Sequence, residues 1–185
     1  LKGDVTTAFA GGEHALLAAI YDPGQPGSLA GSIRSLMWTA THVRERLSVD
    51  HWHSLTRLQR EQQAALKKHP TLAEAIVFLD RVLGVSSSLT GFAMDNMTRD
   101  DGWRFLVVGR RLERLAFLCQ AIAHFLRMPS TRGPGSLEWL LELADSIITY
   151  RSRYSRLPEL MPVVDLLVFD EGNPHGVVFQ ASVLA

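Results

Sequence analysis

The chain has 185 residues, of which 46% are hydrophobic and 21% charged, as in an ordinary folded domain with its own core. Its 19 Lys+Arg residues balance its 19 Asp+Glu residues, so net charge does not favour nucleic acid or a membrane surface as a partner. No apolar run approaches the roughly 20 residues that cross a bilayer, and no signal peptide is visible, so we expect a cytoplasmic protein.

Apolar residues recur at helical spacing along nearly the whole chain, and no segment alternates as a strand does. Proline, glycine and capping residues set the expected boundaries. The expected helices cover residues 13–21, 28–47, 48–69, 71–97, 103–128, 136–154 and 163–169, and a last helix starts after 173. The sequence therefore predicts an all-α fold, a multi-helix bundle of seven to eight mostly antiparallel helices.

Three helix starts carry clear local signals. Thr71 and Glu74 have the spacing of a capping box. Asp100 precedes the helix expected from 103, where an acidic residue suits the helix dipole. Asn173 followed by Pro174 predicts an N-cap with proline at the first helical position.

The stretch of residues 98–114 is the most informative in the chain. Its charges interrupt an apolar helical pattern, and Glu113 is spaced to meet Arg110 on the same helix face, with Arg114 beside them. Buried charges persist only when they are paired, so an Arg–Glu network fits the pattern. Such a cluster on a helix is more often a solvated or structural ion-pair network than a catalytic one, and the stretch alone defines no mechanism.

Familiar catalytic motifs are missing from the sequence. It contains no P-loop, no convincing Rossmann fingerprint and no Gly-x-Ser-x-Gly elbow, so we expect no cofactor. His51 and His53 point to different helix faces, and with no HExxH motif and no cysteine pair we expect no metal site.

The remaining candidates are polar residues embedded in the expected helices. Arginine suits planar contacts with carboxylate or phosphate, and carboxylates, amides and phenols can order such a lattice. The candidate substrate or anion ligands are Arg99, Arg110, Arg114, Arg151 and Arg153, and the candidate structural network is Asp100, Asp145, Tyr150 and Asn173.

Four segments in sequence order resemble the alpha-E family, helical proteins named for a Glu-Arg motif. They read SIRSLMWTATHVRERLSVDHWHSL (32–55), GFAMDNMTRDDGWRFLVVGRRLER (91–114), ELADSIITYRSRY (142–154) and DLLVFDEGNPHGVVFQ (165–180). His175 and Gly176 stand where the family commonly has Arg and Ser. The family's earlier helix with its own Glu-Arg pair is not seen. The resemblance implies that residues 1–185 form a single alpha-E-like helical domain, an internal fragment of a longer protein.

The resemblance also implies partners, because alpha-E proteins occur beside or fused to an unusual ATP-grasp protein and beside transglutaminase-like proteins. It implies an accessory or substrate-binding module of an ATP-grasp peptide- or amide-ligase system, with the ATP-grasp protein in the same chain or as a neighbour. A transglutaminase-like protein would be a further partner. Two alternatives remain open: an enzyme for acyl or aminoacyl transfer with Glu113 as general base, and a structural scaffold or adaptor.

Overall fold

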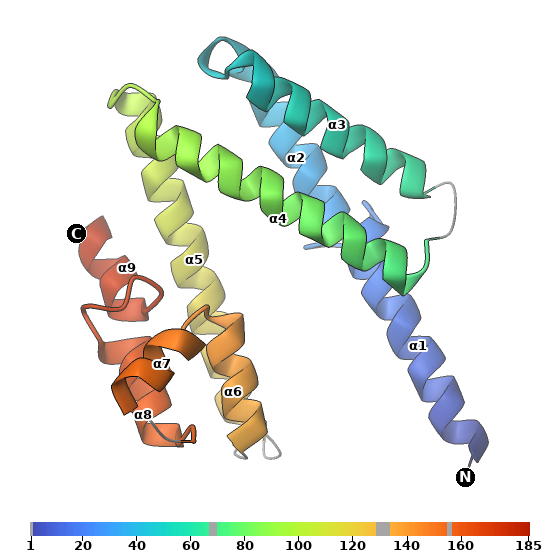
Figure 1. Cartoon of the computed structure of the whole chain (residues 1–185), viewed down its shortest axis with the longest axis vertical. Coiled ribbons are helices and arrows are strands. Elements are labelled where there is room, and N and C mark those ends of the chain that lie inside the picture. The colour runs from blue at the N-terminus through green and yellow to red at the C-terminus, as the bar shows by residue number, and fades with distance from the viewer. Residues whose placement is uncertain (1, 67–69, 129–133, 155–156) are drawn as a thin grey trace. The chain divides into compact units, whose positions relative to one another are not determined.

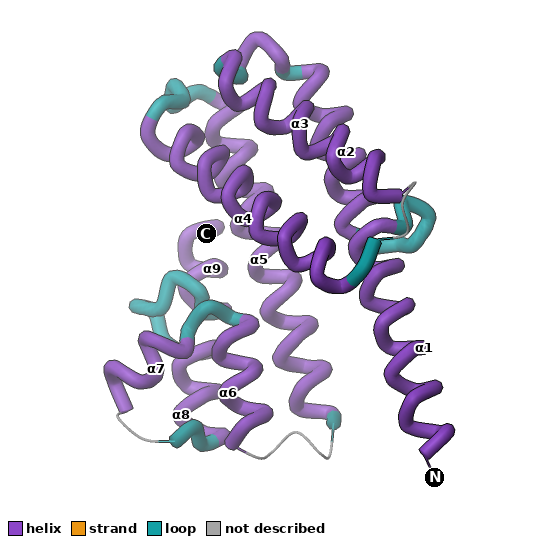
Figure 2. The backbone as a smooth tube through the Cα atoms, turned by 45° about the vertical axis from the view of Figure 1, so that its right-hand side comes forward, coloured by secondary structure: helices purple, strands orange, loops and turns teal. Residues whose placement is uncertain are grey.

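The computed structural model of the chain describes residues 2–66, 70–128, 134–154 and 157–185. These residues form helices and loops, and Figure 2 draws no strand among them, which confirms the all-α class. They contain nine α-helices, one more than the upper expectation. The chain groups into two compact units, Leu1–Met97 and Thr98–Ala185. The single-domain organisation expected for residues 1–185 stays a prediction.

Unit 1 is built from four long helices. They are α1 (Lys2–Tyr21), α2 (Leu29–His42), α3 (Val49–Leu66) and α4 (Leu72–Asp95), with the short 3₁₀ helix η1 (Arg44–Arg46) after α2. Figure 1 shows α2 and α3 side by side, and α3 also packs along α4. The first helix begins well before the expected residue 13, because residues 2–12 contain no proline and their glycines only weaken a helix.

The core of unit 1 joins side chains from all four helices. Tyr21 of α1 stacks on Phe78 of α4, with ring centroids 5.4 Å apart. Ile33 of α2 and Leu55 of α3 are buried against the same cluster. The apolar stripes seen in the sequence thus face one another, and their burial is the main stabilising contribution in this unit.

Side-chain caps define the starts of α4 and α5 (Asp101–Arg127). Thr71 Oγ1 accepts a hydrogen bond from the Glu74 N–H at 3.3 Å, and Glu74 Oε2 accepts one from the Thr71 N–H at 2.8 Å, so the capping box is confirmed. Asp100 Oδ1 accepts a hydrogen bond from the Trp103 N–H at 3.1 Å. Asp100 is therefore the N-cap of α5.

Unit 2 continues from α5 with shorter helices. They are α6 (Pro134–Leu143), α7 (Ile147–Tyr154), α8 (Leu160–Val164), the π-helix η3 (Asp165–Phe169) and α9 (Val177–Leu184). α9 lies along α5, and α6 also contacts α5 (Figures 1 and 2). The core between them includes the buried side chains of Leu118, Phe125, Leu141 and Leu166.

The expectation of one helix over residues 136–154 was wrong, and this accounts for the ninth helix. α6 ends in a Schellman turn, in which the Ser146 N–H donates to Leu141 O at 2.8 Å and the Asp145 N–H donates to Glu142 O at 2.9 Å. Asp145 has a φ of 50°, in the left-handed region. Glycine is the usual residue at this position, so an aspartate there left no clear signal in the sequence.

The start of the last helix was also predicted wrongly. α9 begins at Val177 with Gly176 as its N-cap, three residues later than the Asn173–Pro174 pattern indicated. The side chain of Asn173 is instead buried in contacts with other segments. Among the described residues, no helix is both long enough and apolar enough to cross a membrane.

Loss of the α4 cap gives a direct test of this local structure. Thr71→Ala should lower the free energy of unfolding by about 1 kcal/mol, because it leaves the Glu74 N–H without its side-chain acceptor. Urea unfolding followed by circular dichroism measures the change. Ser35→Ala, at an exposed position inside α2, is the matched control and should be neutral or slightly stabilising, since alanine favours helix interiors. Equal losses in both variants would contradict the capping role.

Candidate functional site

One face of α5 carries three arginines in little more than one helical turn. Arg110 is exposed, whereas Arg111 and Arg114 are half-buried. Glu113 is exposed as well, and within the described part of the chain it forms no ion pair with Arg110 or any other residue. The contact expected between these two side chains is therefore not made. Two solvated side chains gain little from pairing, because water already screens their charges.

Arg111 is held by a neutral partner on α9. Its Nη1 donates a hydrogen bond to Gln180 Oε1 at 3.1 Å, and its guanidinium lies 5.4 Å from the centroid of the Phe179 ring. Gln180 is fully buried, and its amide nitrogen donates to Pro174 O. An amide can orient a guanidinium but cannot neutralise it. The only sequence signal for Gln180 is weak, namely that it is a polar residue in a largely apolar run.

Arg114 lies at two hollows in the surface of unit 2. The more open one is about 500 Å³ in volume and is lined by Gly109, Arg110, Glu113, Arg114 and Phe117. The smaller one is about 220 Å³, and its polar lining is Arg114, Asp145 and His175. Its apolar wall is formed by Phe117, Leu118, Leu143 and Ala144. We call this second hollow the Asp145 cavity.

Burial and neighbouring arginines both act on the ionisable groups in and beside the Asp145 cavity. Burial lowers the pKa of His175 below its ordinary value, and Arg114 lowers it further, as does Arg111 more weakly, while Asp145 raises it. Burial also lowers the pKa of Arg110, and repulsion from Arg114 and Arg111 adds to the effect. Burial is the larger cause of both shifts, and repulsion from neighbouring arginines adds to it in each case.

Asp145 occupies a conformation that costs free energy. A residue with a Cβ atom in the left-handed region is destabilised by about 1–2 kcal/mol, although aspartate tolerates the region better than most. Its side chain is 86% exposed, and its Oδ2 lies 3.6 Å from His175 Nε2. Strained non-glycine residues persist where the surrounding structure fixes them, and they cluster at functional sites. The Asp145 carboxylate is thus a candidate functional group.

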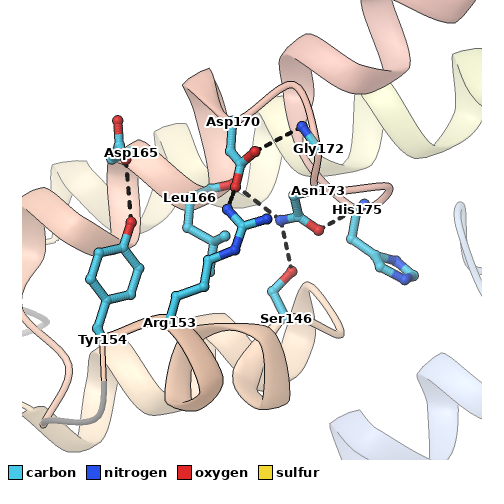
Figure 3. A network of polar contacts seen from close by, with 9 residues as sticks. All are labelled: Ser146, Arg153, Tyr154, Asp165, Leu166, Asp170, Gly172, Asn173 and His175. Atoms are coloured by element: carbon cyan, nitrogen blue, oxygen red, sulfur yellow. Dashed lines mark hydrogen bonds and ion pairs between the residues drawn. The ribbon is translucent and has the colours of Figure 1, made fainter.

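A buried amide positions both Asp145 and His175. Asn173 is fully buried, and its Nδ2 donates to Ser146 Oγ at 3.2 Å and to Leu166 O at 3.0 Å. Its Oδ1 accepts a hydrogen bond from the His175 N–H at 3.1 Å (Figure 3). The amide therefore connects the turn after α6, the π-helix and the segment before α9. Its use in these contacts explains why it does not cap α9.

A second polar group lies on α7 and the residues that follow. Arg153 pairs with Asp170, whose Oδ1 also accepts a hydrogen bond from the Gly172 N–H at 2.7 Å (Figure 3). Arg151 pairs with Glu138 at 2.8 Å. The buried Tyr150 accepts a hydrogen bond from the Glu159 N–H at 3.1 Å through its hydroxyl. These two arginines therefore have carboxylate partners, whereas none is found among the described residues for Arg110, Arg111 or Arg114 of α5.

The structure brings together some of the predicted site residues and separates others. Arg110, Glu113 and Arg114 line one hollow, and Arg114 shares the Asp145 cavity with Asp145. Arg99 instead lies over the Trp103 ring, 4.3 Å from its centroid. Within the described residues, no group of three or more His, Cys, Asp or Glu side chains could hold a metal ion.

Comparison with known proteins identifies the class of domain. The model of the Alpha-E family, described as a predicted alpha-helical domain with a conserved ER motif, matches residues 3–185. The chain belongs to this family. Uncharacterised proteins of Mycobacterium bovis and of two Mycobacterium tuberculosis strains are 32% identical to it over 166 residues. The match covers 86% of this chain and 19% of each relative, so the chain spans about a fifth of their length. No solved structure matches.

Removal of the buried amide tests its role as a connector. Asn173→Ala leaves Leu166 O and the His175 N–H without their partners, and each unsatisfied buried group costs about 1–3 kcal/mol. Urea unfolding should therefore show a loss of about 3 kcal/mol. Glu171→Ala, at an exposed position two residues away, is the control and should change stability little. A near-neutral Asn173→Ala variant would contradict the connecting role.

The lowered pKa of His175 predicts a pH dependence of stability. Below the ordinary histidine pKa of about 6.5, the unfolded chain binds more protons than the folded one, so stability rises with pH in that range. The contribution of His175 to the free energy of unfolding is fully present above a pH of about 6.5, and it is lost as the pH falls through the pKa of His175 in the folded state. His175→Gln should flatten this part of the stability profile, measured by urea unfolding. His124→Gln, in the last turn of α5, controls for histidine loss in the same unit. An unchanged slope in His175→Gln would refute the assignment.

Proposed function

We propose that this chain is an accessory, substrate-binding module of an ATP-grasp peptide- or amide-ligase system, and that the arginine face of α5 binds a substrate carboxylate. One observation carries the proposal. Arg110, Arg111 and Arg114 lie close enough to repel one another, and within the described residues none of them pairs with a carboxylate. Such a set is suited to an anion that arrives from outside.

Arginine chemistry and the lining of the hollows narrow the kind of anion. The guanidinium fork binds a carboxylate or a phosphate with two parallel hydrogen bonds. Beside Arg114, the cavity wall is apolar, with Phe117 and Leu118 among its residues. A small carboxylate with an apolar group would fit both the charged and the apolar lining. Its charge would pair with arginine, and its hydrocarbon part would be buried against the apolar wall.

The link to an ATP-grasp protein rests on the family resemblance and on the length of the relatives. An ATP-grasp ligase converts a carboxylate into an acyl phosphate, which an amine then attacks. A module that holds the acid or the amine component would supply that enzyme with an oriented substrate. Since the matching region forms about a fifth of each curated relative, it is in them one part of a longer polypeptide. A cytoplasmic location, where ATP is available, belongs to the proposal.

The general-base alternative has less support from the site. Glu113 is exposed, and no hydrogen bond or ion pair among the described residues orients its carboxylate. A catalytic base needs a fixed geometry relative to the proton that it removes. The scaffold alternative predicts that the arginines can be replaced without loss of partner activity, which the following experiment addresses.

The proposal is tested by ATP-dependent phosphate release from the ATP-grasp partner, with mixed amino acids as substrates, in the presence and absence of this chain. The chain should raise the rate. Arg114→Gln should reduce the stimulation by about 10- to 100-fold, mainly through KM, because hydrogen bonds to a charged group contribute about 1.5–3 kcal/mol.

Arg104→Gln is the matched control for this measurement. Arg104 lies on the same helix, but it is exposed and pairs with Asp101 at 3.3 Å. This variant should stimulate the partner as well as the parent chain does. Equal stimulation by Arg114→Gln would favour a scaffold, and no stimulation by the parent chain would overturn the accessory role.

A further inference from the structure

The Asp145 cavity presents opposite charges from different elements of unit 2. Arg114 comes from α5, and Asp145 comes from the turn between α6 and α7. The cavity also has an apolar wall that includes Leu118, which belongs to the buried core, and Leu143. A cavity with a cation, an anion and an apolar wall is complementary to a ligand that carries an anionic group, a cationic group and an apolar group.

We propose that the Asp145 cavity binds a free α-amino acid with an apolar side chain, whose carboxylate pairs with Arg114 and whose ammonium group pairs with Asp145. This inference rests on the proposed function, for which it names the substrate class. The volume of about 220 Å³ lies below the roughly 300–1,000 Å³ of sites for drug-sized ligands, so the cavity suits a ligand of amino-acid size.

The charges on the cavity discriminate among small ligands. An inorganic anion would meet Arg114 but would be repelled by the Asp145 carboxylate. A simple amine would meet Asp145 but would be repelled by Arg114 and Arg111. A zwitterion pairs with both charges of the cavity at once. A ligand that leaves either of these charges unpaired would bind more weakly.

The Asp145 carboxylate is free to accept an ammonium group. Its ion-pair partner among the described residues is His175 if that imidazole is protonated, and the His175 Nε2 is 3.6 Å away. Burial together with Arg114 and Arg111 outweighs the opposite effect of Asp145 and lowers the pKa of His175, so at neutral pH the imidazole is mostly uncharged. A neutral imidazole does not cancel the carboxylate. The left-handed backbone of Asp145 and the contacts of Asn173 fix the place from which the carboxylate acts.

The test is a calorimetric titration of the 185-residue chain at pH near 7.5 with three ligands of one shape. They are L-leucine, 4-methylpentanoate, which is leucine without its amino group, and 3-methylbutylamine, which is leucine without its carboxylate. L-Leucine should bind about tenfold more tightly than either analogue, since each analogue leaves one charge of the cavity unpaired.

Two variants assign the ammonium contact to Asp145. Asp145→Asn keeps a side chain that tolerates the left-handed region, so the turn is retained while the charge is removed. In this variant L-leucine should bind no more tightly than 4-methylpentanoate. Glu142→Gln makes the same chemical change at an exposed position of α6 that does not line the cavity, and it should keep the preference for L-leucine.

The outcomes separate the two proposals. If L-leucine and 4-methylpentanoate bind equally, and Arg114→Gln weakens both, then carboxylate binding stands and the amino-acid assignment is overturned. If L-leucine is preferred but Asp145→Asn keeps that preference, the assignment to this cavity is overturned. If neither ligand binds in a way that depends on Arg114, both proposals fail.

Discussion

The buried amide of Asn173 is the interaction on which the site in unit 2 depends. A fully buried polar side chain is tolerated only when its donors and acceptor are used, and Asn173 uses them on three separate segments. The side chain therefore sets the spacing between the turn after α6 and the segment before α9. Asp145 stands on the first of these and His175 on the second. One satisfied amide in the core thus connects the two segments that carry Asp145 and His175.

Repulsion among the arginines on one face of α5 destabilises unit 2 locally, and burial of apolar residues in the core of the unit offsets this. Like charges within one turn repel one another, and the pKa of Arg110 is lowered first by partial burial and then by that repulsion. The same helix buries Leu118, Ile122 and Phe125 in the core, which holds its position whatever the charges do. One part of α5 thus stabilises unit 2 through buried apolar residues, and another part carries the arginines. Sites whose own interactions are unfavourable are typical of functional surfaces.

Sequence reasoning reached the fold class and most helix boundaries because both depend on local physics. Periodicity reports which face is buried, and the Thr71–Glu74 box reports a cap through side chains three residues apart. The failures have tertiary causes. Asp145 ends a helix at a position where glycine would have been the signal. Asn173 resembles an N-cap, although its side chain is hydrogen-bonded to residues distant in sequence.

For the site, the sequence identified Arg114, Asp145 and Asn173 as candidates but could not show which of them lie together. Gln180 was missed. Both failures arise because these contacts join residues far apart in the chain.

The charged groups at this site are suited to holding a ligand in place. Arginine stays charged at physiological pH, and the exposed carboxylate of Asp145 is available to bind a cation, so these groups pair with the charges of a bound ligand. Where such contacts are equally strong in the ground state and the transition state, they contribute to affinity and orientation and not to the chemical step. A module of this kind is useful where another protein activates the bound acid, because a substrate that is already oriented reacts as if at high local concentration. The proposed function therefore assigns the reaction chemistry to a partner, and the further inference assigns the specificity for the substrate to the Asp145 cavity.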